Sequence, residues 1–245
     1  MKISKFSRDY SICSYECDAK GTLRIVSLMN MFQDAADTHA EMLGVGIEHC
    51  IKHGLAWFGS NYHIKIFRMP SWHEKMKIIT WPSQEKKIGA VRDFEVVDEE
   101  GKVIIVASSQ WILIDFAKKR PLALRENLPD YEVVEERALE TEFAKINLPE
   151  NITFKKSFAV RYDDIDVNGH VNNAVYSLWA TEAVENDFRL KNYPSEIEIS
   201  FKKETLYGDI VNVSTQIDGE ISLHEMTAGD DNHEIARLRI MWQKA

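Results

Sequence analysis

The chain has 245 residues, of which 44% are hydrophobic and 28% charged, and its net charge is −9. This composition is typical of a folded globular protein, and the length allows one large domain or two small ones. The negative charge disfavours nucleic acid and anionic membranes as partners. No apolar run approaches the ~18 residues of a membrane span, and the first residues lack the apolar stretch of a signal peptide.

Sparse cysteines indicate the compartment. Cys13, Cys17 and Cys50 form a small, odd set that does not predict a disulfide framework. We therefore expect a soluble protein in the reducing cytoplasm. Cys13 and Cys17 have no second pair of ligands at metal-site spacing, and His49 and His53 have no third ligand. We therefore predict no metal and no cofactor.

The first half of the chain predicts a short strand, a turn at Gly21, one helix and several strands. Apolar residues at 3.6-residue spacing from Leu28 to Ala36 indicate the helix. We expect Asp34, Asp37 and His39 on its polar face. The later strands are expected at His63–Phe67, Met76–Trp81, Ala90–Val97 and Val103–Asp115.

An acidic segment without an amphipathic pattern follows and predicts a surface linker at residues 129–152. It separates an N-terminal unit, residues 1–128, from a C-terminal unit, residues 153–245. The second unit repeats the order of elements, with a strand at Phe158–Tyr162 and a helix from about Val175 to Ala183. Its later strands are expected at Glu196–Lys202, Ile210–Gln216, Glu220–Met226 and His233–Met241.

The two halves form a weak internal duplication, which points to a repeated fold. The matched positions are Asp18 with Asp166, Gly21 with Gly169, Ile64 with Ile199, Trp72 with Tyr207 and Met76 with Val211. One helix followed by antiparallel strands is an α+β layout. We predict a tandem double hot-dog, in which two long apolar helices are wrapped by a continuous antiparallel β-sheet.

Residues 162–173 concentrate three carboxylates, three amides and a histidine between a predicted strand and a predicted helix. Asp166, Asn168 and His170 alternate, so their side chains project to one side of an extended loop. Hydrolysis of an ester or thioester needs a base or nucleophile, and donors for the oxyanion. Asp166 fits the first role, with Asn168 and His170 assisting, and the backbone N–H groups of Gly169 and Val171 fit the second.

The same loop is equally typical of a turn that caps a helix. Asn172 and Asn173 fit the capping role. The first-half counterparts of the three polar residues are Asp18, Lys20 and Thr22. Only the second half carries the amide and the imidazole, which favours chemistry there.

Together these residues resemble the acyl-ACP thioesterase family of plants and bacteria. Its signature D-x-N-x-H-V-N-N-x-x-Y is matched by Asp166, Asn168, His170, Val171, Asn172, Asn173 and Tyr176. The resemblance covers nearly the whole chain, including Ala56-Trp57, Pro70-Ser71-Trp72 and Lys119-Arg120-Pro121.

The resemblance implies an enzyme of fatty acid biosynthesis that hydrolyses fatty acyl-acyl carrier protein to free fatty acid and acyl carrier protein. It implies an acyl-chain pocket in the first repeat and catalysis by Asp166, Asn168, His170 and Glu204 in the second. Asp166 would be base or nucleophile. Thr205 stands where plant members carry a cysteine, so a thiolate is excluded at that position.

Two alternatives stay open. Single hot-dog acyl-CoA thioesterases share such a loop at about half this length, so the duplication favours the carrier protein over coenzyme A without excluding it. A non-catalytic acyl-binding hot-dog module is the alternative from a different class. Hot-dog hydratases place the histidine five residues after the aspartate, whereas the interval here is four, so hydratase chemistry is disfavoured.

Acyl carrier protein is acidic, so its binding requires a local cationic surface. Lys202 and Lys203 beside Glu204 are the first candidates; the others are Lys86 and Lys87 with Arg92, and Lys118, Lys119 and Arg120. Lysine pairs are also common as plain edge protection. Phe32, Trp57 and Trp111 are expected to line the acyl pocket, although each one alone is more typical of a core. A homodimer is left open.

Overall fold

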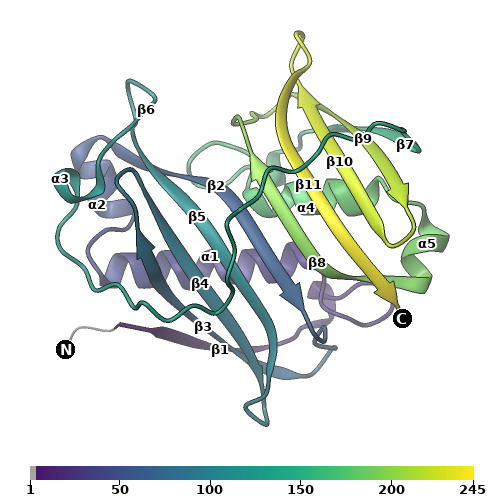
Figure 1. Ribbon diagram of the computed structural model, residues 1–245, viewed down its shortest axis with the longest axis horizontal. Coiled ribbons are helices and arrows are strands. Elements are labelled where there is room, and N and C mark those ends of the chain that lie inside the picture. Colours follow the sequence, from purple (N-terminus) through teal and green to yellow (C-terminus); the bar gives the residue numbers. More distant parts are fainter. Residues whose placement is uncertain (1–3) are drawn as a thin grey trace. The chain divides into compact units, whose positions relative to one another are not determined.

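The structure, a computed structural model that describes residues 4–245, divides into two compact units (Figure 1). The first unit extends to Glu142, and the second comprises Phe143–Ala245. Each unit packs a helix against one face of an antiparallel sheet, so the predicted α+β class is confirmed for both.

In the first unit the strand order is β1-β3-β4-β5-β2, with the short β6 paired to β5. All of these pairs are antiparallel. The strands are β1 (Phe6–Ser11), β2 (Leu55–Ile66), β3 (Lys75–Glu85), β4 (Gly89–Asp98), β5 (Val103–Asp115) and β6 (Arg120–Pro121). The helices are the 3-10 turn η1 (Ser14–Glu16), α1 (Ile25–Met42), α2 (Ile47–His53) and α3 (Leu124–Asn127).

Helix α1 buries the apolar stripe that predicted it. Leu28, Phe32 and Ala35 are fully buried, at spacings that place them on one face of the helix. The ring of Phe32 stacks on Phe94 of β4, with 4.6 Å between centroids. This contact fixes the helix against the sheet.

Two sequence predictions about the first unit are wrong. His39 lies on the buried face of α1 with no exposed surface, and its Nδ1 is 3.1 Å from Nη1 of Arg92. Arg92 and Phe94 are two residues apart on β4, so both point inward. Arg92 is only 9% exposed, and burial lowers its pKa to about 10. It therefore cannot belong to a cationic surface.

In the second unit the order is β8-β11-β10-β9-β7, again antiparallel throughout. The strands are β7 (Phe154–Ala159), β8 (Asn192–Phe201), β9 (Ile210–Asp218), β10 (Ile221–Ala228) and β11 (His233–Lys244). The helices are the 3-10 turn η2 (Tyr162–Asp164), α4 (Asn173–Glu182) and α5 (Asn186–Lys191). Helix α4 has 10 residues, close to the predicted bounds, whereas α1 has 18, so only the first of the two helices is long.

Two strands differ most from their predicted bounds. β2 begins at Leu55, well before the predicted His63, because a bulge between Gly59 and Asn61 interrupts the alternation that would reveal it. β7 lies four residues before the predicted strand, and Tyr162 belongs to η2 instead. An exposed edge strand lacks the apolar alternation that marks a buried one.

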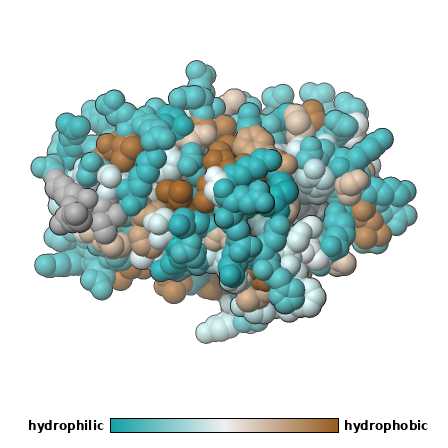
Figure 2. Space-filling view, turned by 90° about the horizontal axis from the view of Figure 1, so that it is seen from below, coloured by the Kyte–Doolittle hydropathy of each residue, from teal (hydrophilic) through white to brown (hydrophobic). Residues whose placement is uncertain are grey.

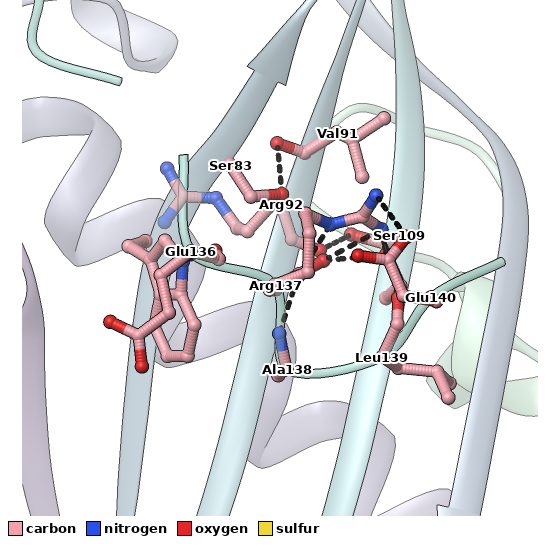
Figure 3. Close-up of polar contacts among 12 residues, drawn as sticks. Ser83, Val91, Arg92, Ser109, Glu136, Arg137, Ala138, Leu139 and Glu140 are labelled. Atoms are coloured by element: carbon pink, nitrogen blue, oxygen red, sulfur yellow. Dashed lines mark hydrogen bonds and ion pairs between the residues drawn. The ribbon is translucent and has the colours of Figure 1, made fainter. Parts of the chain in front are cut away.

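Residues 129–153 form neither helix nor strand. In the first unit this connecting segment lies over the outer face of the sheet, where Figure 3 shows Arg137 and Ala138. Arg137 Nε donates to Asp93 Oδ2 over 2.8 Å, and Asp93 is fully buried. Ala138 N also donates to Asp93 Oδ2, and Trp81 Nε1 donates to the carbonyl of Glu136, both over 2.8 Å.

The face that Figure 2 shows is mostly hydrophilic, with separate hydrophobic patches. None of the helices in the described part of the chain has both the length and the apolar character of a membrane span.

Candidate active site

Two loops of the second unit adjoin each other at the start of α4. Residues 160–172 connect β7 to α4, and residues 202–209 connect β8 to β9. Val171 N donates to Thr205 O over 2.9 Å, and Val160 N donates to Asp209 O over 2.9 Å. The hydroxyl of Tyr176 on α4 donates to Thr205 Oγ1 over 3.0 Å. These bonds hold both loops against the helix.

The Asp166 carboxylate organises the first loop into a tight turn. Its Oδ1 accepts from Asn168 N at 2.8 Å and from His170 N at 3.4 Å, and its Oδ2 accepts from Asn168 Nδ2 at 3.4 Å. Asp166 N donates to His170 O over 2.8 Å, and Gly169 N donates to Asp166 O over 3.0 Å. Gly169 has φ 80°, a left-handed conformation that favours glycine.

The second loop contributes a carboxylate to the imidazole. His170 Nε2 lies 3.1 Å from Glu204 Oε2, and the two side chains are 23% and 33% exposed. In the neutral tautomer that donates from Nε2, Nδ1 of His170 carries the lone pair. A carboxylate in this position fixes the tautomer and orientation of the ring and stabilises it once protonated. The pair therefore has the geometry of a general base that water can reach.

The start of α4 bears out one part of the capping interpretation. Asn172 is the N-cap, and its Oδ1 accepts from Ala174 N over 2.9 Å. Its own backbone N–H donates to Asp164 O over 2.8 Å. Asn173 is the first helical residue and not the cap.

The backbone N–H groups proposed for the oxyanion are occupied. Gly169 N donates to Asp166 O, and Val171 N donates to Thr205 O. A donor already paired inside the protein is not aimed at a substrate oxygen. This arrangement argues against the prediction that Gly169 and Val171 form an oxyanion hole, which spacing alone had suggested.

The first unit contains the same turn. Asp18 N donates to Thr22 O at 2.8 Å, and Gly21 N donates to Asp18 O at 3.0 Å, with φ 75° at Gly21. Asp18 Oδ1 accepts from Lys20 N at 2.9 Å and from Thr22 N at 3.1 Å. The turn carboxylate thus makes equivalent backbone bonds in both copies, and the duplication inferred from the sequence is confirmed.

The two copies differ in the side chains that this shared backbone presents. Leu23 N donates to Pro70 O as Val171 N donates to Thr205 O, so Met69 corresponds to Glu204. Where the second copy has His170 and Glu204, the first has Thr22 and Met69. The residues that set the turn are therefore common to both copies, whereas the imidazole–carboxylate pair belongs to the second alone.

The predicted pocket residues all lie in the first unit. Phe32 is in the core against β4, and Trp111 meets Tyr62 edge to face at 6.2 Å and donates from Nε1 to Ser109 Oγ over 2.8 Å. Trp57 packs instead against a smaller cluster that contains Cys50, and its Nε1 donates to the carbonyl of Val45. Trp57 pairs with Leu113 and Gly59 pairs with Trp111, so Trp57 and Trp111 are diagonal neighbours on one face of the sheet.

Lys202 and Lys203 are exposed and make no side-chain ion pair within the described chain. A cavity of about 420 Å³ opens on the outer face of the second sheet and contains none of the predicted site residues. Its lining includes Ile146, Leu223 and the ion pair of Arg239 with Glu198.

Comparisons with known proteins agree with this architecture. The model of the acyl-ACP thioesterase N-terminal domain matches residues 3–131, and that of the C-terminal domain matches residues 149–244. An acyl-[acyl-carrier-protein] hydrolase of Cuphea viscosissima is 28% identical over 257 residues, covering 97% of this chain and 62% of that protein. A palmitoyl-acyl carrier protein thioesterase of Gossypium hirsutum is 27% identical over 263 residues, covering 97% and 63%.

The chain thus spans less than two thirds of the length of these two chloroplastic relatives. Among solved structures, an acyl-ACP thioesterase from Bacteroides thetaiotaomicron superposes with a TM-score of 0.89 at 23% identity, covering 98% of each chain. This likeness bears out the predicted hot-dog fold. Since family models match both halves and the first covers more than half of the chain, this protein belongs to the acyl-ACP thioesterase family.

Proposed function

We propose that the protein hydrolyses fatty acyl thioesters of acyl carrier protein, releasing free fatty acid and the carrier's thiol. The observation that supports this most is the His170–Glu204 pair, 3.1 Å apart and water-accessible, in one copy of a duplicated turn. Family membership supplies the substrate class.

The proposed reaction uses water as the nucleophile. Neutral His170 takes a proton from water at Nδ1 while the water oxygen bonds to the thioester carbonyl carbon. Glu204 stabilises the imidazolium that forms. The tetrahedral intermediate then collapses, the carbon–sulfur bond breaks, and the leaving thiolate receives the proton from His170. Asn168 is exposed on the same turn, and its Nδ2 carries a second hydrogen besides the one directed at Asp166, so it is the proposed side-chain donor to the oxyanion.

Asp166 has a positioning role in this scheme, because its carboxylate holds the backbone of Asn168 and His170. The prediction from the sequence makes Asp166 itself the base or nucleophile. A nucleophilic Asp166 would incorporate heavy oxygen from labelled water into its carboxylate during a single turnover. We expect no label there, and mass spectrometry of the peptide containing Asp166 decides the point.

Three further predictions from the sequence stay predictions. They are the acyl pocket around Phe32, Trp57 and Trp111, the homodimer, and the cytoplasmic location.

The test is thiol release from acyl-acyl carrier protein and from the matching acyl-CoA. We expect faster release from the carrier protein, and we expect His170→Ala to lower kcat by roughly 10²–10⁴-fold, the usual contribution of a general base. Glu204→Gln keeps the shape of the side chain and should lower kcat less. Equal or faster release from acyl-CoA would favour the CoA thioesterase alternative, and tight binding without turnover would favour a binding module.

A further inference from the structure

Four large apolar side chains stand exposed on the two loops that carry the His170–Glu204 pair. We call them the apolar collar; they are Tyr162 (80% exposed), Val167 (91%), Leu206 (51%) and Tyr207 (68%). The rings of Tyr162 and Tyr207 meet edge to face, with centroids 6.5 Å apart, across the two loops. Exposed apolar side chains gathered in this way are a recognised sign of an interaction surface.

The fold does not require these side chains, and the first unit supplies the control. Its loops share most of these backbone hydrogen bonds, and three of the four collar positions hold small residues there. Tyr162, Val167, Leu206 and Tyr207 correspond to Ser14, Ala19, Ser71 and Trp72. The apolar side chains at these three positions are therefore not needed to form the turn, and they stay exposed in the second unit.

Two cations stand beside the collar. Lys202 and Lys203 are exposed and form no ion pair among the described residues. Their counterparts in the first unit are Phe67 and Arg68, and Arg68 is bound by Glu74 at 2.8 Å. An apolar centre with an unpaired charged rim is the usual anatomy of a protein-binding patch. The rim charge is opposite to that of an acidic partner.

We propose that the apolar collar, with Lys202 and Lys203, is the docking surface for the acidic carrier protein. This inference rests on the proposed function, since the carrier brings the thioester. Because the collar lies on the same two loops as His170 and Glu204, a carrier seated on it delivers its acyl-pantetheine arm beside the pair. Lys203 directly precedes Glu204, which places the rim charge next to the reacting groups.

The test compares two substrates with one acyl chain, acyl-acyl carrier protein and the carrier-free acyl-N-acetylcysteamine thioester. The collar variant Y162S/V167A/L206S introduces the residues of the first unit. We expect it to lower kcat/KM for the carrier substrate by at least ~10-fold, the loss typical of truncated anchor residues, mainly through KM. Hydrolysis of the carrier-free thioester should stay within about twofold of the wild type.

Exposed residues of the first unit supply the matched control. Tyr15 and Phe67 are 73% and 61% exposed, and Y15S/F67S should leave both reactions unchanged. K202A/K203A should raise KM for the carrier substrate at low salt and much less at about 0.5 M salt. Added salt shortens the Debye length and so weakens the attraction between exposed charges. Thermal unfolding checks that each variant folds; if the triple variant does not, V167A and Y162S are measured singly.

The outcomes separate the two proposals. A wild-type protein that hydrolyses neither substrate contradicts the proposed function. A wild-type protein that hydrolyses both, with a collar variant that loses both equally or neither, overturns the docking surface alone. Light scattering that shows a wild-type dimer and a monomeric collar variant also overturns it, because the collar would then join two copies of the chain.

Discussion

At the scale of single residues, a comparison of the two turn aspartates distinguishes a structural role from a catalytic one. Asp18 and Asp166 accept equivalent backbone N–H bonds, so the bonds made by Asp166 are not by themselves evidence of catalysis. What distinguishes the second copy is a pair formed across two loops, His170 with Glu204. Catalysis is therefore best assigned to the residues in which the copies differ.

Substituting the two aspartates tests this separation. Asp18→Ala and Asp166→Ala each remove the turn's side-chain acceptor, so both should lower the free energy of unfolding by roughly 1–3 kcal/mol. Only Asp166→Ala should also reduce thiol release, because only that turn positions His170. Urea denaturation and steady-state kinetics measure the two effects. A matching loss of activity in Asp18→Ala would contradict the assignment.

His224 is a buried residue whose neutral form the fold requires. Its Nδ1 lies 2.9 Å from Thr215 Oγ1 and its Nε2 lies 2.8 Å from Ser222 Oγ, and Trp242 Nε1 donates to the same Ser222 oxygen. Burial lowers the pKa of His224 to about 3. Because the unfolded chain binds a proton that the folded chain excludes, acid destabilises the fold.

The folded pKa of His224 lies below its unfolded value of ~6.5, so its contribution is complete above that pH and decreases as the pH falls. From pH 6 to 4 we expect wild type to lose about 1.4 kcal/mol more per pH unit than His224→Phe. Phe94 occupies the corresponding position of the first unit. Equal slopes for wild type and His224→Phe would contradict the pKa assignment.

At the scale of elements, the connecting segment is held by buried polar contacts although it has no regular structure. Asp93 on β4 is fully buried and accepts from Arg137, Ala138 and Ser108. A buried carboxylate with several donors is satisfied only while the segment stays in place. The segment therefore behaves as part of the first unit's sheet face and not as a free tether.

Removing the segment's cation should destabilise the first unit. Arg137→Ala leaves the Asp93 charge buried and without its ion-pair partner, which typically costs about 3–5 kcal/mol. Arg125 is the matched control: its side chain is 86% exposed and pairs with Glu85, so Arg125→Ala should cost at most ~1 kcal/mol. Urea denaturation of both variants checks this. Similar losses for the two would show that Asp93 does not depend on Arg137.

For the whole molecule, the duplication could be predicted from the sequence because turn residues such as Asp18 and Gly21 are identical in the second half, whereas most other positions differ. Helix positions and most strands followed from periodicity. Arg92 and His39 could not be placed, because a charged residue on a buried face has no local signal and depends on partners far along the chain. His170 and Glu204 are likewise far apart in sequence, so only the resemblance to a family joined them.

The most direct measurement exchanges the distinguishing residues between the copies. N168K/H170T/E204M gives the second unit the side chains of the first, on a turn whose backbone bonds do not depend on them. We predict that this variant unfolds within a few degrees of the wild type and that thiol release from acyl-acyl carrier protein falls by at least ~10³-fold. A variant that folds and retains release within tenfold of the wild type would contradict the account.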